Sequence, residues 1–281
     1  MKCMSKELYS ILPQRLRPQI QQRDCDALEE IRLRWNSPVV LKIKGAYQTL
    51  DLPVTQEDLS FVIHTASRYS PWNAESMAFG YLTAPGGHRI GVCGQVVTEG
   101  GRIKGIRTVS SLCIRVCREI ENAGNQVDLR DSLLIVGPPG SGKTTLLRAL
   151  VTRISREKRG AVCVVDERGE LFPTSGGAFS FDPGAHTDVL SGCSKAEGVE
   201  MALRSMGPDW IAVDEITAGR DCDGLLQAAW CGVKLLATAH ASGMEDLMRR
   251  QIYKPLLETK LFRTVVVLQK DKTLHQERVV L

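Results

Sequence analysis

One segment of the chain has the residue types and spacing needed to bind phosphate groups. Gly137–Thr144 reads GPPGSGKT and fits the pattern G-x-x-x-x-G-K-[ST] at every position. Glycines permit the positive φ angles at which successive backbone N–H groups point inward at an anion. Lys143 supplies a positive charge for the β- and γ-phosphates, and the Thr144 hydroxyl can ligate Mg²⁺. The segment therefore predicts a site for a nucleoside triphosphate with Mg²⁺.

The residues on either side of this loop have the order that a phosphate-binding loop requires. Ser132–Val136 has the composition of a buried strand, and apolar residues recur at helical spacing from Leu146 to Ile154. The helix that begins at Lys143 directs its positive dipole end at the phosphates. We expect nucleotide contacts from every residue of the loop and from the one after it: Gly137, Pro138, Pro139, Gly140, Ser141, Gly142, Lys143, Thr144 and Thr145.

Two acidic residues follow a second predicted strand. Trp210–Asp214 is apolar up to its last residue, and Glu215 comes next. Residues just beyond the carboxyl ends of parallel strands face the ligand crevice of an open α/β sheet. Asp214 is expected to hold Mg²⁺ together with Thr144, and Glu215 to orient or deprotonate an attacking water. A solvated acid pair is the alternative, but the strand before it and the loop upstream favour the catalytic interpretation.

Two further strand ends carry polar residues. AVCVVDERGE places Asp166, Glu167, Arg168 and Glu170 at one of them, and LLATAH places Thr238 and His240 at the other. The acids could position water, and His240 could sense the γ-phosphate as a hydrogen-bond donor, although a structural histidine is an equal alternative. Arg204, in the helix before Trp210, could pair with a carboxylate or reach a phosphate, although an exposed helical arginine is the commoner case.

The elements that must position these residues indicate two domains. The length of 281 residues favours about two domains. From residue 126 onward, apolar strand-like runs alternate with helical segments, which predicts a parallel sheet with crossover helices. The polar, turn-prone residues 121–126 read as a linker. We therefore expect an N-terminal domain over residues 1–123 and a second domain over residues 124–281.

The N-terminal half predicts an α+β domain. Glu30–Trp35 alternates apolar and basic residues and, with Val39–Ile43, predicts a hairpin. Thr55–Tyr69 predicts a helix that Thr55 and Asp58 cap. Short strands punctuated by glycine follow, among them RIKGIRTV and SLCIRV as two separate strands.

Charge and hydropathy limit the remaining classes of function. The net charge of +4 lies entirely in Met1–Asn125, which has 16 Lys and Arg against 12 Asp and Glu. Such an excess is usually a solvated surface, but it leaves open a nucleic-acid-dependent ATPase that remodels or moves DNA or RNA. Apolar runs are far shorter than the roughly 20 residues of a membrane span, and the polar N-terminus does not read as a signal peptide, so we expect a cytoplasmic protein.

Motifs in both halves of the chain resemble known families. GPPGSGKTTLLR, VVDERGE, ALRSMGPDWIAVDEI and GVKLLATAH together resemble the type II/IV secretion and type IV pilus ATPases. LEEIRLRWNSPVVL, YLTAPGGHRIGVCGQVV and IKGIRTVSSLCIRV resemble the stage III sporulation protein AA family of endospore-forming bacteria. The resemblance covers nearly the whole chain. It implies an α/β fold: a RecA-like P-loop ATPase domain with a mainly parallel sheet, preceded by a smaller α+β N-terminal domain.

The resemblance also implies an activity, cofactors and partners. It implies hydrolysis of ATP with Mg²⁺ to power the assembly or operation of a secretion-like channel during endospore formation. The expected assembly is a homo-oligomer, a hexameric ring, docked in the mother-cell cytoplasm on membrane-embedded partner proteins of a sporulation channel complex. Nucleic acid is not an expected partner. A scaffold gated by nucleotide with negligible turnover is a third possibility.

Several residues take roles from the resemblance alone. The acidic box of the secretion ATPases corresponds here to Asp166, Glu167 and Glu170, their histidine box to His240, and the arginine before the Walker B strand to Arg204. Glu167, Arg204 and His240 are therefore predicted to be catalytic, together with Lys143 and Glu215. Basic residues of the N-terminal domain reach a neighbouring subunit's nucleotide in such rings, and the candidates are Arg89, Arg107 and Arg115.

Overall fold

The computed structural model describes residues 5–67, 80–117, 124–175 and 178–278. The chain divides into two compact units. Unit 1 comprises Met1–Arg118 and Pro173–Phe181, and unit 2 comprises Glu119–Phe172 and Asp182–Leu281. Pro173–Phe181 thus groups with unit 1, although it lies within the second of the domains expected from the sequence. The expected boundary after residue 123 adjoins residues 118–123, which lie outside the described residues, so it stays a prediction.

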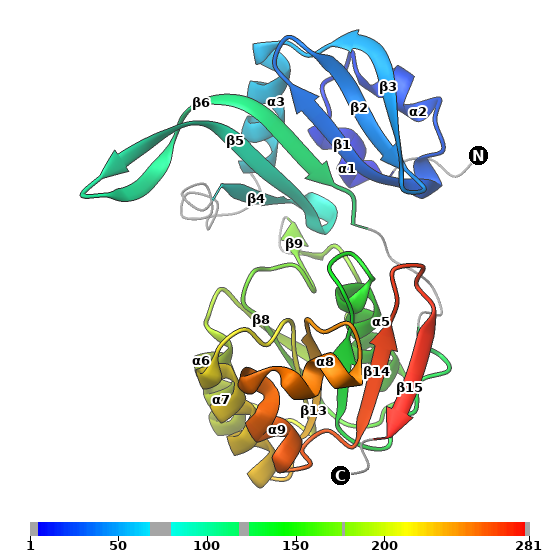
Figure 1. Cartoon of the computed structure of the whole chain (residues 1–281), viewed down its shortest axis with the longest axis vertical. Helices are drawn as coiled ribbons and strands as arrows, with labels where there is room; N and C mark the ends of the chain where they lie inside the picture. Colours follow the sequence, from blue (N-terminus) through cyan, green and yellow to red (C-terminus); the bar gives the residue numbers. More distant parts are fainter. Residues whose placement is uncertain (1–4, 68–79, 118–123, 176–177, 279–281) are drawn as a thin grey trace. The chain divides into compact units, whose positions relative to one another are not determined.

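Unit 1 contains an antiparallel six-stranded sheet in the order β3-β2-β1-β6-β5-β4, drawn in blue to green in Figure 1. Its apolar side chains, from Leu8 to Ile114, form one buried core. The elements of this unit are α1 (Lys6–Ile11), α2 (Arg17–Gln21), η1 (Cys25–Ala27), β1 (Leu28–Arg34), β2 (Pro38–Ile43), β3 (Ala46–Pro53), α3 (Gln56–Ser67), β4 (Tyr81–Ala84), η2 (Pro85–Gly87), β5 (His88–Glu99), β6 (Arg102–Arg115), β9 (Thr174–Ser175) and β10 (Ala178–Phe179).

Local sequence accounts for most of these elements. β1 and β2 pair as the predicted hairpin. The Thr55 hydroxyl accepts from the Asp58 N–H at 3.3 Å, and the Asp58 carboxylate accepts from the Thr55 N–H at 2.7 Å, so the predicted capping box of α3 is confirmed. The predicted alternation of β1 is confirmed, with Ile31 and Leu33 buried and Arg32 and Arg34 on the less buried face, and Arg32 forms an ion pair with Glu30 at 2.8 Å. This pairing reduces the basic character that suggested a nucleic-acid surface.

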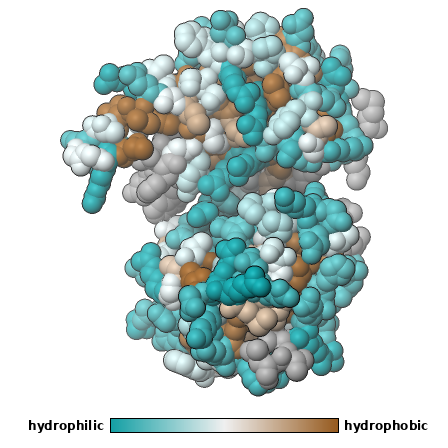
Figure 2. Space-filling model, viewed as in Figure 1, coloured by the Kyte–Doolittle hydropathy of each residue, from teal (hydrophilic) through white to brown (hydrophobic). Residues whose placement is uncertain are grey.

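The segment predicted as two strands, RIKGIRTV and SLCIRV, is the single strand β6, so that prediction was wrong. β6 pairs with β5 along its whole length, with register shifts at three places, and one of these shifts skips Ser110 between the two apolar runs. The distal half of this hairpin extends beyond the rest of the sheet (Figure 1). It carries apolar surface (Figure 2). Two apolar residues of this hairpin, Val96 and Ile103, are 48% and 53% exposed.

Unit 2 contains a seven-stranded sheet in the order β11-β8-β12-β13-β7-β14-β15, in which β15 is antiparallel and the other strands are parallel. The expected α/β class with a mainly parallel sheet, preceded by an α+β unit, is confirmed. The elements are β7 (Leu133–Val136), α5 (Lys143–Arg156), β8 (Val162–Asp166), β11 (Thr187–Ser191), α6 (Lys195–Ser205), β12 (Trp210–Val213), α7 (Gly219–Trp230), β13 (Lys234–Ala239), α8 (Met244–Arg249), η3 (Gln251–Tyr253), α9 (Lys254–Glu258), β14 (Thr264–Leu268) and β15 (Leu274–Arg278).

Helices cover both faces of this sheet, which explains why its inner strands are mostly apolar and are buried along nearly their whole length. Through α5 the chain passes from β7 to β8, towards the β11 edge of the sheet. Through α6 and α7 it passes from β11 to β12 and on to β13, in the opposite direction. Because parallel crossovers are right-handed, opposite directions place α5 on one face and the α6–α7 pair on the other. One consequence matters most for the site: β13 lies between β7 and β12. The residues after these three strands therefore meet at one edge of the sheet.

Candidate active site

The loop between β7 and α5 has the backbone that its glycines predict. Gly140 and Gly142 have φ angles of 76° and 101°, in the left-handed region that side chains disfavour. At Gly137 a Cβ atom would lie 2.5 Å from Ser141 Oγ and 2.6 Å from the Leu268 carbonyl oxygen, so only glycine fits. The Ser141 hydroxyl is buried and has no hydrogen-bond partner among the described residues. A loop with an unsatisfied polar atom and helix N–H groups at its end fits a phosphate ligand.

Lys143 lies at the centre of the site and is 6% exposed. Its ammonium donates to the Gly137 carbonyl at 2.9 Å, to the Pro138 carbonyl at 3.1 Å and to His240 Nδ1 at 3.0 Å. Burial lowers the pKa of Lys143, and the nearby carboxylates of Asp214 and Glu215 oppose that shift. These contacts hold the charge at the loop, where a phosphate would supply the counter-charge.

His240, at the end of β13, connects Lys143 to Glu215. A charged ammonium can only donate, so His240 Nδ1 is the acceptor and the ring proton resides on Nε2. That nitrogen lies 2.9 Å from Glu215 Oε1. His240 can therefore pass a change at the phosphate-binding lysine on to the predicted catalytic carboxylate.

The predicted metal pair is also brought together. Thr144 Oγ1 donates to Asp214 Oδ2 at 2.9 Å, and Thr238 Oγ1 donates to Asp214 Oδ1 at 2.5 Å. A hydroxyl and a carboxylate oxygen are the hard ligands that Mg²⁺ prefers, so the donor set fits this ion. In the part of the chain that the structure describes, no group of three or more His, Cys, Asp or Glu side chains is arranged as a metal site. A bound Mg²⁺ would thus depend on the phosphates for further ligands.

Sequence reasoning did not assign Thr238 a role in the site. Its hydroxyl donates to Asp214 and accepts from the Glu215 N–H at 2.8 Å, and the residue is fully buried. Glu215 itself has a φ of 46°, which is unusual for a residue with a side chain. Thr238 therefore stabilises the bend that presents the Glu215 carboxylate. The signal in the sequence was a hydroxyl inside an otherwise apolar strand.

The acidic box divides into residues with different tasks. Asp166 is 2% exposed, and its carboxylate accepts from the backbone N–H groups of Glu170, Leu171 and Phe172 at 2.9, 2.9 and 3.0 Å. Burial raises the pKa of Asp166, although the three backbone donors work in the opposite direction. Asp166 thus shapes the loop after β8, whereas Glu167 forms an ion pair with Lys195.

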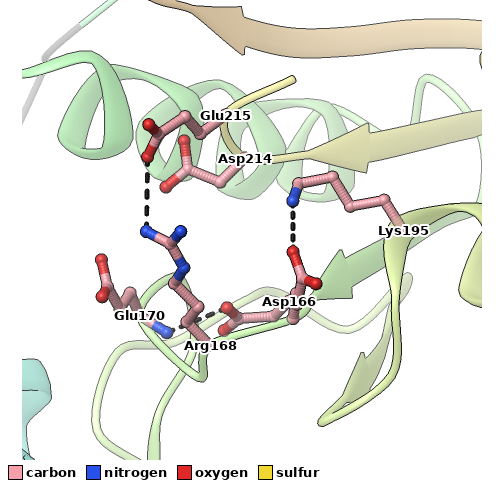
Figure 3. A pocket seen from close by; sticks show the side chains of 7 residues that line it. Asp166, Arg168, Glu170, Lys195, Asp214 and Glu215 are labelled. Atoms are coloured by element: carbon pink, nitrogen blue, oxygen red, sulfur yellow. Dashed lines mark hydrogen bonds and ion pairs between the residues drawn. The ribbon is translucent and has the colours of Figure 1, made fainter. Parts of the chain in front are cut away.

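A pocket opens between these strand ends (Figure 3). Arg168 reaches across it to Glu215, with 3.5 Å between Nη1 and Oε2. Five carboxylates and two cations surround this small space. The lining residues are Asp166, Glu167, Arg168, Glu170, Lys195, Asp214 and Glu215.

The predicted site residues are not all neighbours. Contacts join Lys143, Thr144, Asp214, Glu215 and His240, and Glu167 lines the adjoining pocket. The Arg204 side chain is 77% exposed on α6 and pairs with Glu200 one turn away at 2.5 Å.

The three candidate arginines of unit 1 differ in their surroundings. Arg89 lies over the ring of Tyr81 at 4.5 Å, whereas Arg107 and Arg115 are exposed. Roles for Arg204 and for these arginines at a neighbouring subunit's nucleotide stay predictions.

Known proteins match this chain over residues of both units. The family model for sporulation stage III, protein AA matches residues 3–279. Stage III sporulation protein AA of Bacillus subtilis strain 168 is 36% identical over 95% of this chain and 91% of its own length. Protein SEEDLING PLASTID DEVELOPMENT 1 of Arabidopsis thaliana is 23% identical over 85% of this chain but only 34% of its own length.

Solved structures share the fold. The Legionella pneumophila ATPase DotB matches 98% of this chain and 82% of its own with a TM-score of 0.58 and 16% identity. The pilus retraction motor PilT with bound ADP matches 89% of this chain and 76% of its own with a TM-score of 0.57 and 16% identity. Among the described residues, no helix combines the length and apolar character that crossing a bilayer requires.

Proposed function

The chain belongs to the family of sporulation stage III, protein AA, and from this membership we propose that it hydrolyses ATP to drive a secretion-like apparatus during endospore formation. The observation that carries the proposal is the continuous set of contacts from Lys143 through His240 to Glu215, beside the Thr144–Asp214 pair. These groups come from three neighbouring strand ends, and together they match the needs of phosphoryl transfer to water.

Each residue has a task in the proposed reaction. Lys143 and the N–H groups of the loop bind the β- and γ-phosphates and stabilise the charge that develops on them. Thr144 and Asp214 would hold Mg²⁺, which when bound neutralises phosphate charge and helps to orient the triphosphate. Glu215 orients the attacking water and accepts its proton. His240 hydrogen-bonds both Lys143 and Glu215, so the state of the phosphate site affects the base.

The chemistry is tested by separating binding from turnover. Glu215→Gln should bind ATP with nearly unchanged affinity and release phosphate at least about a hundredfold more slowly, because the amide cannot act as a base. Lys143→Ala should lose ATP binding itself. Binding is measured with a fluorescent ATP analogue and turnover by phosphate release. Wild-type turnover by the Glu215→Gln variant would refute the assignment of the base, and unaltered binding by Lys143→Ala would refute the nucleotide site.

The proposed motor role is tested in sporulating cells. Strains whose only copy of the gene carries Glu215→Gln or Lys143→Ala should both fail to form spores, since a motor needs turnover. A strain with Glu215→Gln that sporulates normally, beside a defective Lys143→Ala strain, would instead support a scaffold gated by nucleotide. ATPase activity stimulated by polynucleotide with a steep salt dependence would favour the nucleic-acid alternative.

The proposed ring is tested by mass measurement in solution. The fold shared with the secretion and pilus motors supports an oligomer in which an arginine of one subunit completes the site of the next. The mass is expected to rise to that of a hexamer with a non-hydrolysable ATP analogue. A monomer both with and without the analogue would contradict the ring and the role of Arg89, Arg107 or Arg115 in trans.

A further inference from the structure

Lys195 is a buried charge that the reaction outlined above does not use. It is the first residue of α6 and is 4% exposed, whereas lysine is rarely so buried unless it is paired. A lysine in the first turn of a helix also meets the positive end of the helix dipole. Local preferences therefore disfavour a lysine here on two grounds. Residues that contradict local preference without local compensation are found most often at functional sites.

The partner of Lys195 is Glu167, and both residues line the pocket in Figure 3. Their positions follow from the sheet. β11, β8 and β12 are neighbours, with Ser191 opposite Asp166 and Val165 opposite Val213. Lys195 comes shortly after β11, Glu167 directly after β8, and the Asp214–Glu215 pair directly after β12. Three adjacent strand ends thus place the Lys195–Glu167 pair beside the proposed catalytic carboxylates.

Four of the five carboxylates that line this pocket have different partners. Asp166 accepts three backbone N–H groups, Asp214 accepts two hydroxyls, and Glu215 contacts His240 and Arg168. Glu167 contacts Lys195. Without the ammonium, Glu167 would share the pocket with four other carboxylates, and the remaining cation, Arg168, pairs with Glu215. Repulsion would then turn the Glu167 carboxylate away from the pocket.

We propose that Lys195 is a positioning residue that holds the Glu167 carboxylate in the pocket, where Glu167 assists Glu215 in orienting the attacking water. This inference rests on the proposed ATPase function. The exposure of the two side chains supports this division of roles: that of Lys195 is 5% exposed and that of Glu167 is 36% exposed. The lysine is thus enclosed by protein, whereas the glutamate lines the pocket and is accessible to water. Lys195 acts through Glu167 and does not contact the reacting atoms.

The decisive experiment is a double-mutant cycle on the full chain, read out as kcat and KM for ATP hydrolysis. Lys195→Met keeps the side-chain length without the charge, and Glu167→Gln removes the group on which Lys195 acts. Lys195→Met should lower kcat by about 10- to 100-fold, the usual cost of losing a group that orients a catalytic residue, with less than about a threefold change in KM. Because Lys195 acts through Glu167, the double variant should be no slower than Glu167→Gln alone.

Two control variants separate positioning from general stability. Lys195→Arg should recover most of the lost kcat, because it restores a cation that can pair with Glu167. Lys254→Met is the matched control: Lys254 is also the first residue of a helix, α9, but its side chain is 58% exposed and its ion pair with Glu258 spans 3.6 Å. It should leave kcat and KM unchanged.

The outcomes distinguish this inference from the proposed function. If the wild-type chain binds ATP but shows no turnover, the proposed function is refuted and the role of Lys195 with it. If wild-type turnover survives in Lys195→Met, or if the Lys195→Met and Glu167→Gln effects multiply in the double variant, the inference alone is refuted. A loss of kcat that Lys195→Arg does not restore, accompanied by a lowered unfolding midpoint, would also overturn it in favour of a purely structural ion pair.

Discussion

Thr238 offers a sharp test because one buried hydroxyl serves two acidic residues. Its Oγ1 donates to Asp214 at 2.5 Å and accepts from the Glu215 N–H at 2.8 Å. Valine has nearly the same shape but cannot make either bond. Thr238→Val should therefore leave the strand packed while it releases both the metal carboxylate and the backbone bend at Glu215.

The expected loss of stability follows from the two bonds. A hydrogen bond to a charged group contributes about 1.5–3 kcal/mol, and a buried N–H left unsatisfied costs about 1–3 kcal/mol. Asp214 and Glu215 are partly exposed, so water can replace part of the loss, and we expect a net cost near the lower end, about 2–3 kcal/mol. Because Glu215 has a φ of 46°, the unsupported backbone should relax and move the carboxylate. A displacement of about 1 Å is enough to lower kcat about 100-fold.

Thr238→Ser is the matched control. Serine keeps the hydroxyl and removes one methyl group, which should cost about 1 kcal/mol and leave most of the turnover. Urea unfolding followed by circular dichroism gives the stabilities, and phosphate release gives kcat. If Thr238→Val is as stable and as active as Thr238→Ser, the hydroxyl does not support the site and the description of the Glu215 bend is wrong.

Three other predictions concern single features of the site. Asp166→Asn should destabilise the chain by about 1–3 kcal/mol in urea unfolding, because an amide cannot accept all three backbone N–H groups. The control is Asp182→Asn, at an exposed carboxylate that also accepts a backbone N–H, and it should cost less stability. Equal losses of stability would contradict the role of Asp166 in holding the loop after β8. Burial lowers the pKa of Lys143 from 10.5, so the ammonium loses its proton at a lower pH than an exposed lysine does. ATP affinity measured between about pH 7 and pH 10 should therefore fall as the pH rises towards that lowered pKa. Lys143→Arg should remove this pH dependence. Gly142→Ala should weaken ATP binding about tenfold in the same assay, because alanine at a φ of 101° costs about 1–2 kcal/mol. No other atom lies within 4 Å of the Cβ that alanine would add, so the cost is conformational. Unchanged affinity would show that the loop tolerates another backbone conformation.

Local sequence was sufficient for the parts of the fold and site that depend on near neighbours. The phosphate-binding loop, the helix after it and the capping box of α3 each lie within one short segment, so spacing alone identifies them. Asp214 and Glu215 were recognisable because an apolar strand ends just before them. The rule that strand ends meet at one edge of a parallel sheet then predicted their approach to Thr144.

One feature was misread because it depends on pairing between strands. RIKGIRTV and SLCIRV read as two strands, since a β-bulge interrupts the period-two pattern in the same way as a turn. The segment Pro173–Phe181 groups with unit 1, although no change in composition separates it from the ATPase half of the chain. The role of Arg204 stays a prediction: its side chain is exposed and pairs with Glu200 along its own helix, and the proposed role concerns a neighbouring subunit.

The sequence by itself thus determined that this protein has a phosphate-binding loop, a mainly parallel α/β unit and acids at the ends of its strands. The tertiary structure decided which of those acids face the pocket and what each one contacts. Asp166 turned inward to cap a loop, Glu167 paired with Lys195, and Thr238 came to lie between the Asp214 carboxylate and the Glu215 backbone N–H. The physical reason is strand order: β13 lies between β7 and β12, and β11 beside β8, and this order depends on packing between residues far apart in the chain.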